Sequence, residues 1–341
     1  MLRALYCIET PDTDPRHNLA LEEVLLRAVR PGQCVLYLWQ NQRTVVIGRN
    51  QHAESECRFR ALENDGGHLV RRLSGGGAVY HDLGNLNFTF LCVHADYDVE
   101  KQTEVILRAV RALGVPAEKN GRNDLTADGR KFSGHAYYRT GDQCYHHGTL
   151  MADVDLAPLE KYLSPSPLKL ADKGVKSVRS RVVNLKSLRP DLTIEALKAA
   201  LRRAFGEVYG LPVTPLSEAD LDRAALDESI ARFSDPLWTY GTDKPLTESR
   251  EGRFDWGLLR LDFTPEDGII RDAALWSDGL WADYLSSVPD RLRDCPLEED
   301  ALRRALLPPP GLEQAANRES APDPAIANDI IQLLLHDGGS L

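Results

Sequence analysis

Three consecutive glycines, Gly75-Gly76-Gly77, follow an arginine pair that ends at Arg72. Glycine backbones can turn successive N–H groups inward as a nest for an anion, and hydrogen bonds to charged partners contribute about 1.5–3 kcal/mol each. The spacing is not that of a P-loop, and no helical pattern follows as it would in a dinucleotide site. The glycine run therefore indicates either an anion-binding loop or a wide hairpin turn.

A second cluster combines a carboxylate and a lysine at hairpin spacing. Asp124 and Lys131 flank the sequence TADG at residues 126–129, which is typical of a tight turn. A hairpin would bring the two side chains near one another across the ladder. The pair is then either an exposed ion pair that contributes little, or part of a phosphate site in which lysine neutralises charge and aspartate holds Mg²⁺.

A third cluster is strongly basic in an otherwise acidic chain. Residues 168–189 carry seven basic side chains and one acid, Asp172. A solvated basic face would explain this composition. The functional alternative is a loop that closes on an anionic intermediate or steers an acidic protein partner.

Composition limits the kinds of protein that could carry these clusters. The 341 residues suffice for one large domain or two ordinary ones, and the net charge of −10 argues against nucleic-acid binding. Six scattered cysteines without a CxxC pair predict reduced thiols and no zinc site. No apolar run approaches the roughly 18 residues of a membrane span, so we expect a cytoplasmic protein that does not enter a membrane.

Periodicity predicts the elements that must position these residues. Apolar residues at helical spacing predict helices at residues 18–29, 100–113 and 194–208. In the first helix, Glu22 and Glu23 are expected on the polar face, and Thr193 is the candidate N-cap of the third. Strands are predicted at residues 34–39, 44–47, 68–72, 86–92, 131–138 and 147–154. The first two are separated by a short polar connection and read as a hairpin.

A second pattern of strands begins near residue 248. Residues 254–263 and 268–276 flank the turn sequence TPEDG and predict a hairpin, and residues 296–307 predict a helix with Pro296 in its first turn. Residues 308–324 are rich in proline and alanine. The chain is therefore predicted to be α+β, with a catalytic domain at residues 1–248 and a small α+β accessory domain at residues 249–341.

Taken in order, the motifs resemble those of the bacterial-type lipoate-protein ligase A family with its C-terminal accessory domain. The resemblance rests on NLALEE at 18–23, TVVIGR at 44–49, residues 71–90, GRNDL at 121–125, KFSGHA at 131–136, HHGTL at 146–150, GVKSVRSRVVNL at 174–185 and FDWG at 254–257. It covers nearly the whole chain. It implies a mixed-sheet catalytic domain similar to biotin protein ligases and class II aminoacyl-tRNA synthetases.

The resemblance also implies a two-step reaction. Lipoate and ATP, with Mg²⁺, would give lipoyl-AMP and pyrophosphate, and the lipoyl group would then pass to a lysine of a carrier domain. The implied acceptors are the apo lipoyl domains of 2-oxoacid dehydrogenase E2 subunits and the glycine cleavage H protein. We expect the enzyme to work as a monomer.

Residue roles follow from the same resemblance. It assigns ATP or adenylate binding to Arg72, Ser74, Gly75, Gly76, Gly77, Ala78, Val79, Tyr80, Lys131, Lys176 and Arg179. It assigns the lipoate pocket to Leu19, Trp39, Arg49, His81, Lys131 and His147. Lys131 and Asp124 would be catalytic, and Asp124 is the candidate Mg²⁺ ligand. His135 departs from the small polar residue of many relatives and could trim or extend the pocket.

Four alternatives remain open from the sequence, one of which is an enzyme that adenylates lipoate but needs a separate transferase. An octanoyl or lipoyl transferase would use a cysteine nucleophile and no ATP, and Cys144 is the one cysteine near the motifs. A biotin ligase would share the fold and the adenylation chemistry. A lipoate-binding module would keep the pocket without turnover.

Overall fold

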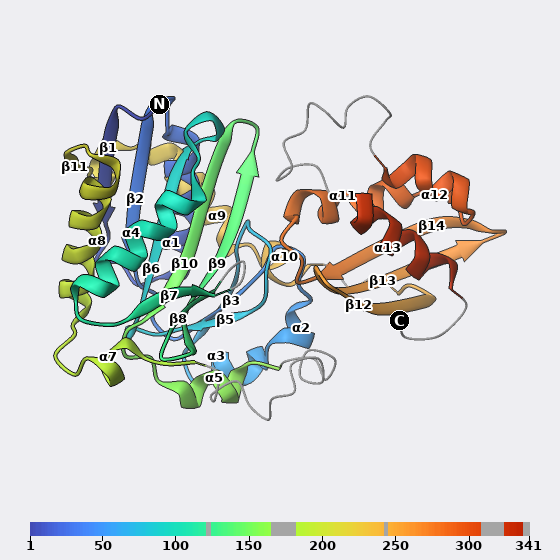
Figure 1. Cartoon of the computed structure of the whole chain (residues 1–341). Coiled ribbons are helices and arrows are strands. Elements are labelled where there is room, and N and C mark those ends of the chain that lie inside the picture. Colours follow the sequence, from blue (N-terminus) through green and yellow to red (C-terminus); the bar gives the residue numbers. More distant parts are fainter. Residues whose placement is uncertain (121–123, 165–181, 242–244, 308–323, 337–341) are drawn as a thin grey trace.

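The computed structural model describes residues 1–120, 124–164, 182–241, 245–307 and 324–336. These residues form a large N-terminal part around two sheets and a small C-terminal α+β domain around a third (Figure 1). The C-terminal domain runs from β12 to α13. The predicted residues Lys176 and Arg179 lie outside the described ranges.

The largest sheet is mixed and has eight strands in the order β11-β1-β2-β6-β10-β9-β8-β7. Its strands are β1 (Ala4–Glu9), β2 (Gln33–Trp39), β6 (Asn85–Val93), β7 (Ala117–Asn120), β8 (Asp124–Ala127), β9 (Arg130–Thr140), β10 (Gln143–Met151) and β11 (Val213–Pro215). The strand β1 runs parallel to β2 and β11, and the remaining pairs are antiparallel. This arrangement confirms the predicted α+β fold with a mixed sheet.

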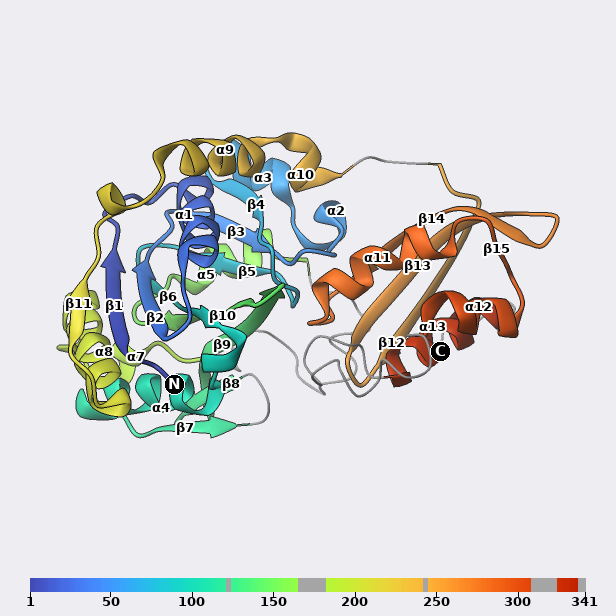
Figure 2. The same cartoon turned by 90° about the horizontal axis from the view of Figure 1, so that it is seen from above.

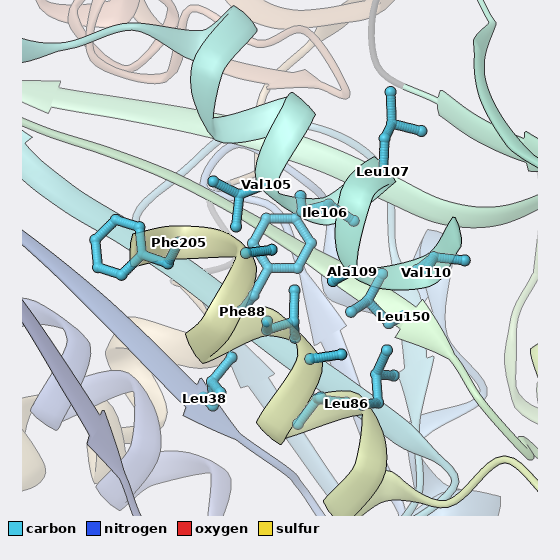
Figure 3. Packing of buried hydrophobic residues seen from close by; sticks show 14 of the residues in the cluster. Leu38, Leu86, Phe88, Val105, Ile106, Leu107, Ala109, Val110, Leu150 and Phe205 are labelled. Carbon is cyan, nitrogen blue, oxygen red and sulfur yellow. The ribbon is translucent and has the colours of Figure 1, made fainter. Parts of the chain in front are cut away.

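Helices cover both faces of this sheet (Figure 2). On one face, α4 (Val99–Ala112) and α8 (Ile194–Tyr209) pack Val105, Ile106 and Phe205 against Phe88 and other buried strand residues (Figure 3). On the other face lie α1 (Pro15–Ala28) and α9 (Arg223–Ser234). The shorter helices are α2 (Ala53–Glu56), α3 (Phe59–Asn64), α5 (Leu156–Tyr162), α7 (Leu185–Leu188) and α10 (Pro236–Tyr240), with 3-10 turns at His94–Asp96 and Glu218–Asp220.

A three-stranded sheet carries the glycine run. It consists of β3 (Thr44–Ile47), flanked by β4 (His68–Arg71) and β5 (Val79–His81). The predicted hairpin of residues 34–39 and 44–47 is therefore wrong, because the two strands belong to different sheets. Both edges of β2 are already occupied by β1 and β6, and the connection turns away at Arg43, whose φ is 41°. The glycine run joins β4 to β5 and not two neighbouring strands.

The C-terminal domain has an antiparallel sheet of β12 (Glu248–Phe254), β13 (Gly257–Glu266), β14 (Ile269–Ser277) and β15 (Cys295–Pro296). The helices α11 (Ala282–Leu292), α12 (Glu299–Leu306) and α13 (Pro324–Leu335) pack on it. The predicted hairpin through TPEDG is confirmed as β13–β14. The helix expected from residue 296 begins instead at Glu299, because Pro296 pairs with Ile269 in the sheet.

The long amphipathic helices are confirmed as α1, α4 and α8, and the Thr193 side chain accepts a hydrogen bond from the Ala196 N–H as the N-cap of α8. Periodicity did not predict α9 or α13. The expectation that Glu22 and Glu23 face solvent is wrong, since they are only 1% and 4% exposed. Glu23 is ion-paired with Arg27 and Arg232, which offsets part of the cost of burying its charge. Within the described residues, no helix has both the length and the apolar character of a membrane span.

Candidate active site

The glycine loop is folded around a buried arginine. The Arg72 guanidinium donates to Ser74 Oγ at 2.9 Å and to the carbonyl oxygens of Gly75 and Gly77 at 2.6 and 2.9 Å. A further donor reaches the Val46 carbonyl at 3.2 Å. Burial lowers the pKa of Arg72 to about 10, so the side chain stays charged at neutral pH. Arg72 thus shapes the loop as well as supplying positive charge beside it.

The three glycines differ in what an added side chain would meet. A Cβ on Gly75 would lie 2.2 Å from the carbonyl oxygen of Gly279 in the C-terminal domain. Gly76 has a φ of 90°, which side chains rarely adopt, and its N–H donates to the Gly279 carbonyl at 3.2 Å. A Cβ on Gly77 would meet none of the described atoms within 4 Å. Gly77 is therefore the position at which a side chain would project into open space.

That open space belongs to a cavity of about 480 Å³ between the N-terminal part and the C-terminal domain. Predicted site residues that line it are Leu19, Trp39, Arg72, Gly76, Gly77, Ala78, Val79, His81, Asp124, Lys131 and His147. Its walls come from α1, both sheets of the N-terminal part, the glycine loop and β13. Residues more than a hundred positions apart in the chain thus meet at one surface.

Of the predicted site residues that the structure describes, four do not line this cavity. Ser74 and Gly75 belong to the buried base of the glycine loop. Tyr80 on β5 points toward Tyr162 of α5, with ring centroids 5.9 Å apart. The Arg49 guanidinium lies 4.5 Å from the centre of the Trp238 ring.

The C-terminal domain contributes residues that were not predicted as site residues. Arg253, Asp255 and Trp256 line the cavity from the end of β12 and the turn after it, and Asp278 and Leu280 line it from the segment after β14. The FDWG motif at residues 254–257 marked the start of this domain, but its spacing alone does not place it at the site.

Lys131 and Asp124 meet as the hairpin predicted. Lys131 Nζ lies 2.7 Å from Asp124 Oδ1, and both side chains remain more than a third exposed. A β-bulge between Leu125 and Thr126 shifts the register, so that Thr126 pairs with Lys131 and Asp124 pairs with Gly134. A Cβ on Gly134 would come within 2.9 Å of the Lys131 ammonium, so this glycine leaves room for it. The pair presents one positive and one negative group to the cavity.

A buried hydrogen-bond chain links the glycine loop to α1. Glu22 Oε1 accepts from His147 Nδ1 at 2.9 Å and from Thr89 Oγ1 at 2.7 Å. Since a carboxylate only accepts, His147 donates to it through Nδ1, and its Nε2 lies 2.8 Å from the Ser74 hydroxyl oxygen. Trp39 Nε1 donates to Thr89 Oγ1 at 3.1 Å. Glu22, which sequence reasoning missed as part of the site, thus fixes two of the side chains that line the cavity.

Histidines beside the cavity are held in the neutral form. Burial lowers the pKa of His81 to about 3 and that of His135 to about 3, and it places the pKa of His146 well below its usual range. His135 lines the cavity, and its Nδ1 lies 2.9 Å from His146 Nε2. These rings therefore act as neutral hydrogen-bonding groups at physiological pH.

Because these histidines are neutral in the folded protein, we expect the free energy of unfolding to fall in acid. The unfolded chain takes up a proton on each histidine below pH 6.5, whereas folded His135 resists protonation down to about pH 3. The free energy of unfolding should therefore fall by about 1.4 kcal/mol per pH unit for each such histidine as pH falls through this window. Urea titrations from pH 8 to pH 3 give the slope of the free energy of unfolding against pH. For His135→Gln this slope should correspond to about one proton fewer taken up on unfolding than for the wild type. Equal slopes for the variant and wild type would contradict a neutral His135.

None of the six cysteines forms a disulfide, all six are buried, and none of them lines the cavity. Cys144 is only 2% exposed, and its Sγ lies 3.8 Å from His94 Nδ1. A thiol nucleophile has to reach the substrate carbonyl, which this position does not allow.

The cavity can hold an amphiphilic anion. Its lining combines Lys131 on β9, Asp124 on β8 and the open face of Gly77 with the apolar side chains of Leu19 on α1 and Trp39 on β2. The charged groups can neutralise phosphate and carboxylate oxygens, and the apolar side chains can bury a hydrocarbon chain at about 25 cal/mol per Å².

Comparison with known proteins agrees with this arrangement. The family model described as "Lipoyl protein ligase A/B catalytic domain" matches residues 14–206, and "Bacterial lipoate protein ligase C-terminus" matches residues 245–319. The chain is similar to P. falciparum LipL1, solved in complex with lipoate, with 26% identity, a TM-score of 0.81, and coverage of 97% of this chain and 99% of that chain.

Two further solved structures cover a smaller share of this chain. A structure described as a bi-partite lipoate protein ligase and its E2 lipoyl domain from Thermoplasma acidophilum has 29% identity and a TM-score of 0.63 over 72% of this chain and 100% of that chain. A lipoate-protein ligase A bound with ATP has 28% identity and a TM-score of 0.62 over 71% of this chain and 99% of that chain. The catalytic-domain model alone spans more than half of the sequence, and the chain belongs to the lipoyl protein ligase A/B catalytic domain family, with the C-terminal domain of bacterial lipoate protein ligases.

Proposed function

We propose that this protein is an ATP-dependent lipoate-protein ligase that first forms lipoyl-AMP and then transfers the lipoyl group to a lysine of a carrier domain. The observation that carries the proposal is that Lys131, the open face of Gly77 and the apolar residue Trp39 line the same cavity. The complexes of related proteins with lipoate and with ATP support the same assignment. We also retain the proposed division into residues 1–248 and 249–341, and a monomeric state.

The first step would activate the carboxylate. A lipoate oxygen attacks the α-phosphorus of ATP, the bond to the β-phosphate bridging oxygen breaks, and pyrophosphate leaves. Negative charge accumulates on the α-phosphoryl oxygens, and the Lys131 ammonium would stabilise it there. Gly77 would let the nucleotide approach the loop backbone closely.

The second step would be acyl transfer. The neutral amine of the acceptor lysine attacks the lipoyl carbonyl carbon, an amide bond forms, and AMP leaves with the acyl-phosphate oxygen. A free lysine has a pKa of about 10.4, so its neutral form costs roughly 4.6 kcal/mol at pH 7. A mixed anhydride can react despite that cost, whereas an unactivated carboxylate cannot. Lys131 would polarise the carbonyl, and Asp124 or the leaving phosphate would accept the amine proton.

The residues present fit a Mg²⁺ ion that is held largely by ATP. Mg²⁺ commonly binds through one or two carboxylates together with substrate phosphates, and Asp124 supplies one partly exposed carboxylate beside the cavity. Among the described residues there is no cluster of three or more histidine, cysteine, aspartate or glutamate side chains that would form a metal site by itself. Bound there, the ion would neutralise phosphate charge.

We propose the apo lipoyl domains of E2 subunits and the glycine cleavage H protein as acceptors. The description of the T. acidophilum ligase together with its E2 lipoyl domain supports the first of these. Six reduced, buried cysteines support a cytoplasmic location, because disulfides persist mainly in oxidising compartments.

A cysteine-dependent transferase remains the competing hypothesis, and it makes an opposite prediction. We expect Cys144→Ala to keep ATP-dependent lipoylation within about twofold, with a loss in the free energy of unfolding of about 1 kcal/mol from the buried site. Gel-shift or mass measurement of an acceptor domain after incubation with lipoate and Mg-ATP checks this. Loss of lipoylation in a folded Cys144→Ala protein would favour the transferase.

The proposed activation step can be tested without an acceptor. Purified protein, Mg-ATP and lipoate should release pyrophosphate, whereas biotin in place of lipoate should not. Release with biotin alone would support a biotin ligase. Lipoate binding without pyrophosphate release, in the absence and presence of an acceptor domain, would support a binding module.

A further inference from the structure

Two buried donor groups in the cavity wall beside Trp39 have no hydrogen-bond partner among the residues that the structure describes. They are Nε2 of His81 and Nδ2 of Asn87. Both residues line the cavity, and their exposed fractions are only 3% and 1%. Leaving a buried donor unsatisfied costs about 1–3 kcal/mol, so such atoms in a cavity wall point to a ligand group that meets them.

The surrounding amides determine which nitrogen of His81 carries the proton. Asn18 Nδ2 donates to the backbone carbonyls of Asp12 and Gln40 at 3.1 and 2.9 Å, which fixes the orientation of that amide. The same nitrogen lies 3.0 Å from Asn41 Oδ1, so the other end of the Asn41 amide, Nδ2, faces His81 Nδ1 at 3.3 Å. Because Asn41 Nδ2 can only donate, His81 Nδ1 accepts, and Nε2 bears the hydrogen. Burial holds the ring neutral.

Asn87 and His81 both lie next to the indole ring of Trp39. Its Oδ1 accepts from Asn85 Nδ2 at 2.8 Å, which leaves Nδ2 as the donor toward the cavity. Asn87 is the direct cross-strand partner of Trp39, and the His81 ring meets the edge of the same indole with centroids 6.3 Å apart. The two donors therefore flank Trp39, and both are uncharged.

The position of these donors decides which part of a substrate they meet. The only cationic side chains that line the cavity, among the described residues, are Arg72, Lys131 and Arg253. Arg72 is committed to the glycine loop, and Arg253 is ion-paired with Asp278. Lys131 lies on β9, which β6 and β10 separate from Trp39 on β2. An amphiphilic acid whose carboxylate is at Lys131 would direct its far end toward Trp39. In lipoate that end is a ring with two sulfur atoms, which are weak hydrogen-bond acceptors, and in octanoate it is a methyl group.

We propose that His81 and Asn87 are specificity-determining residues that favour an acyl acid with sulfur acceptors at its far end over an all-carbon one. This inference rests on the proposed function for the identity of the substrate. A hydrocarbon end would leave both donors buried and unsatisfied, whereas the ring sulfurs can accept from them. Neutral donors suit this task, because a charged group facing a dithiolane would be desolvated without compensation.

The sharpest test compares lipoate with its cyclopentyl analogue, in which two methylene groups replace the sulfur atoms. Calorimetric titration of the full-length protein should give tighter binding of lipoate by about two- to tenfold for each donor, as expected for a neutral hydrogen bond of about 0.5–1.5 kcal/mol. The analogue is the more hydrophobic ligand, so burial alone would favour it. Equal binding, or tighter binding of the analogue by the wild type, would overturn the proposal.

Variants test each donor separately. Asn87→Leu and His81→Phe keep the approximate size and remove the donors, so each should lower the preference for lipoate by about two- to tenfold. Asn184→Leu is the matched control, because its amide bonds the backbone of Val154, away from the cavity, and its loss should leave the preference unchanged. An unchanged preference in both donor variants, or an equal change in the control, would refute the inference.

Binding and catalysis separate this inference from the proposed function. If the wild type prefers lipoate over the analogue but releases no pyrophosphate from ATP, the specificity inference stands and the ligase proposal fails. If it releases pyrophosphate equally well with both acids at limiting concentration, the ligase proposal stands and the inference fails.

Discussion

Replacing Lys131 by alanine should reduce lipoate-dependent pyrophosphate release by about a hundred- to a thousandfold, the range expected when one preorganised charge-stabilising group is lost. Lys131 is the cationic side chain of β9 that lines the cavity, and its ammonium is 2.7 Å from Asp124 Oδ1. The ion pair is partly exposed, so its loss should change the free energy of unfolding by less than about 1 kcal/mol. Activity and stability are therefore expected to respond very differently.

Arg130→Ala is the matched control for that experiment. Arg130 precedes Lys131 on the same strand, is exposed, and pairs with Asp128 at 3.4 Å. It does not line the cavity. Its replacement should leave pyrophosphate release within about twofold of the wild type. Comparable losses in Arg130→Ala and Lys131→Ala, or near-normal activity in Lys131→Ala, would remove Lys131 from the proposed mechanism.

Gly77→Val should weaken ATP binding by at least about a hundredfold, the factor produced by roughly 3 kcal/mol of steric conflict. A Cβ at this position meets no described atom within 4 Å, and Gly77 has no positive φ, so the folded protein can accommodate the side chain. The conflict arises only when the nucleotide occupies the cavity. Gly77→Ala should lie between the wild type and Gly77→Val. Calorimetric titration with a non-hydrolysable ATP analogue and urea unfolding measure the two effects separately.

Gly75→Ala provides the contrast within the same loop. Its Cβ would collide with the Gly279 carbonyl, so this variant should disturb the packing of the C-terminal domain on the loop. Faster proteolysis in the C-terminal domain is the expected sign. If Gly77→Val lowers stability as much as Gly75→Ala does and leaves ATP binding intact, the loop is a turn and not a nucleotide wall.

Local patterns predicted the parts of the site that depend on neighbouring residues. The turn at residues 126–129 was sufficient to place Asp124 beside Lys131, because a tight turn fixes the pairing of the strands that it joins. The helical periodicity of α4 and α8 also predicted these helices and their buried faces, because the apolar stripe of an amphipathic helix packs against a core.

Longer-range features could not be derived in the same way. The sequence of β2 and β3 is typical of a hairpin, but β2 pairs with β1 on one edge and with β6 on the other. Glu22 is a charged residue of α1, and its buried carboxylate accepts hydrogen bonds from His147 on β10 and Thr89 on β6. The spacing of residues along the chain does not indicate such partners, because they come from distant segments.

The most direct measurement follows the oxygen atoms of the substrate. The protein is incubated with Mg-ATP, an apo lipoyl domain and lipoate that carries a heavy oxygen isotope in both carboxylate positions, and the nucleotide product is analysed by mass spectrometry. If lipoate is adenylated, one labelled oxygen appears in AMP for each lipoyl group transferred, while the pyrophosphate stays unlabelled. Unlabelled AMP, or lipoylation of the domain without ATP consumption, would contradict the proposed ligase mechanism.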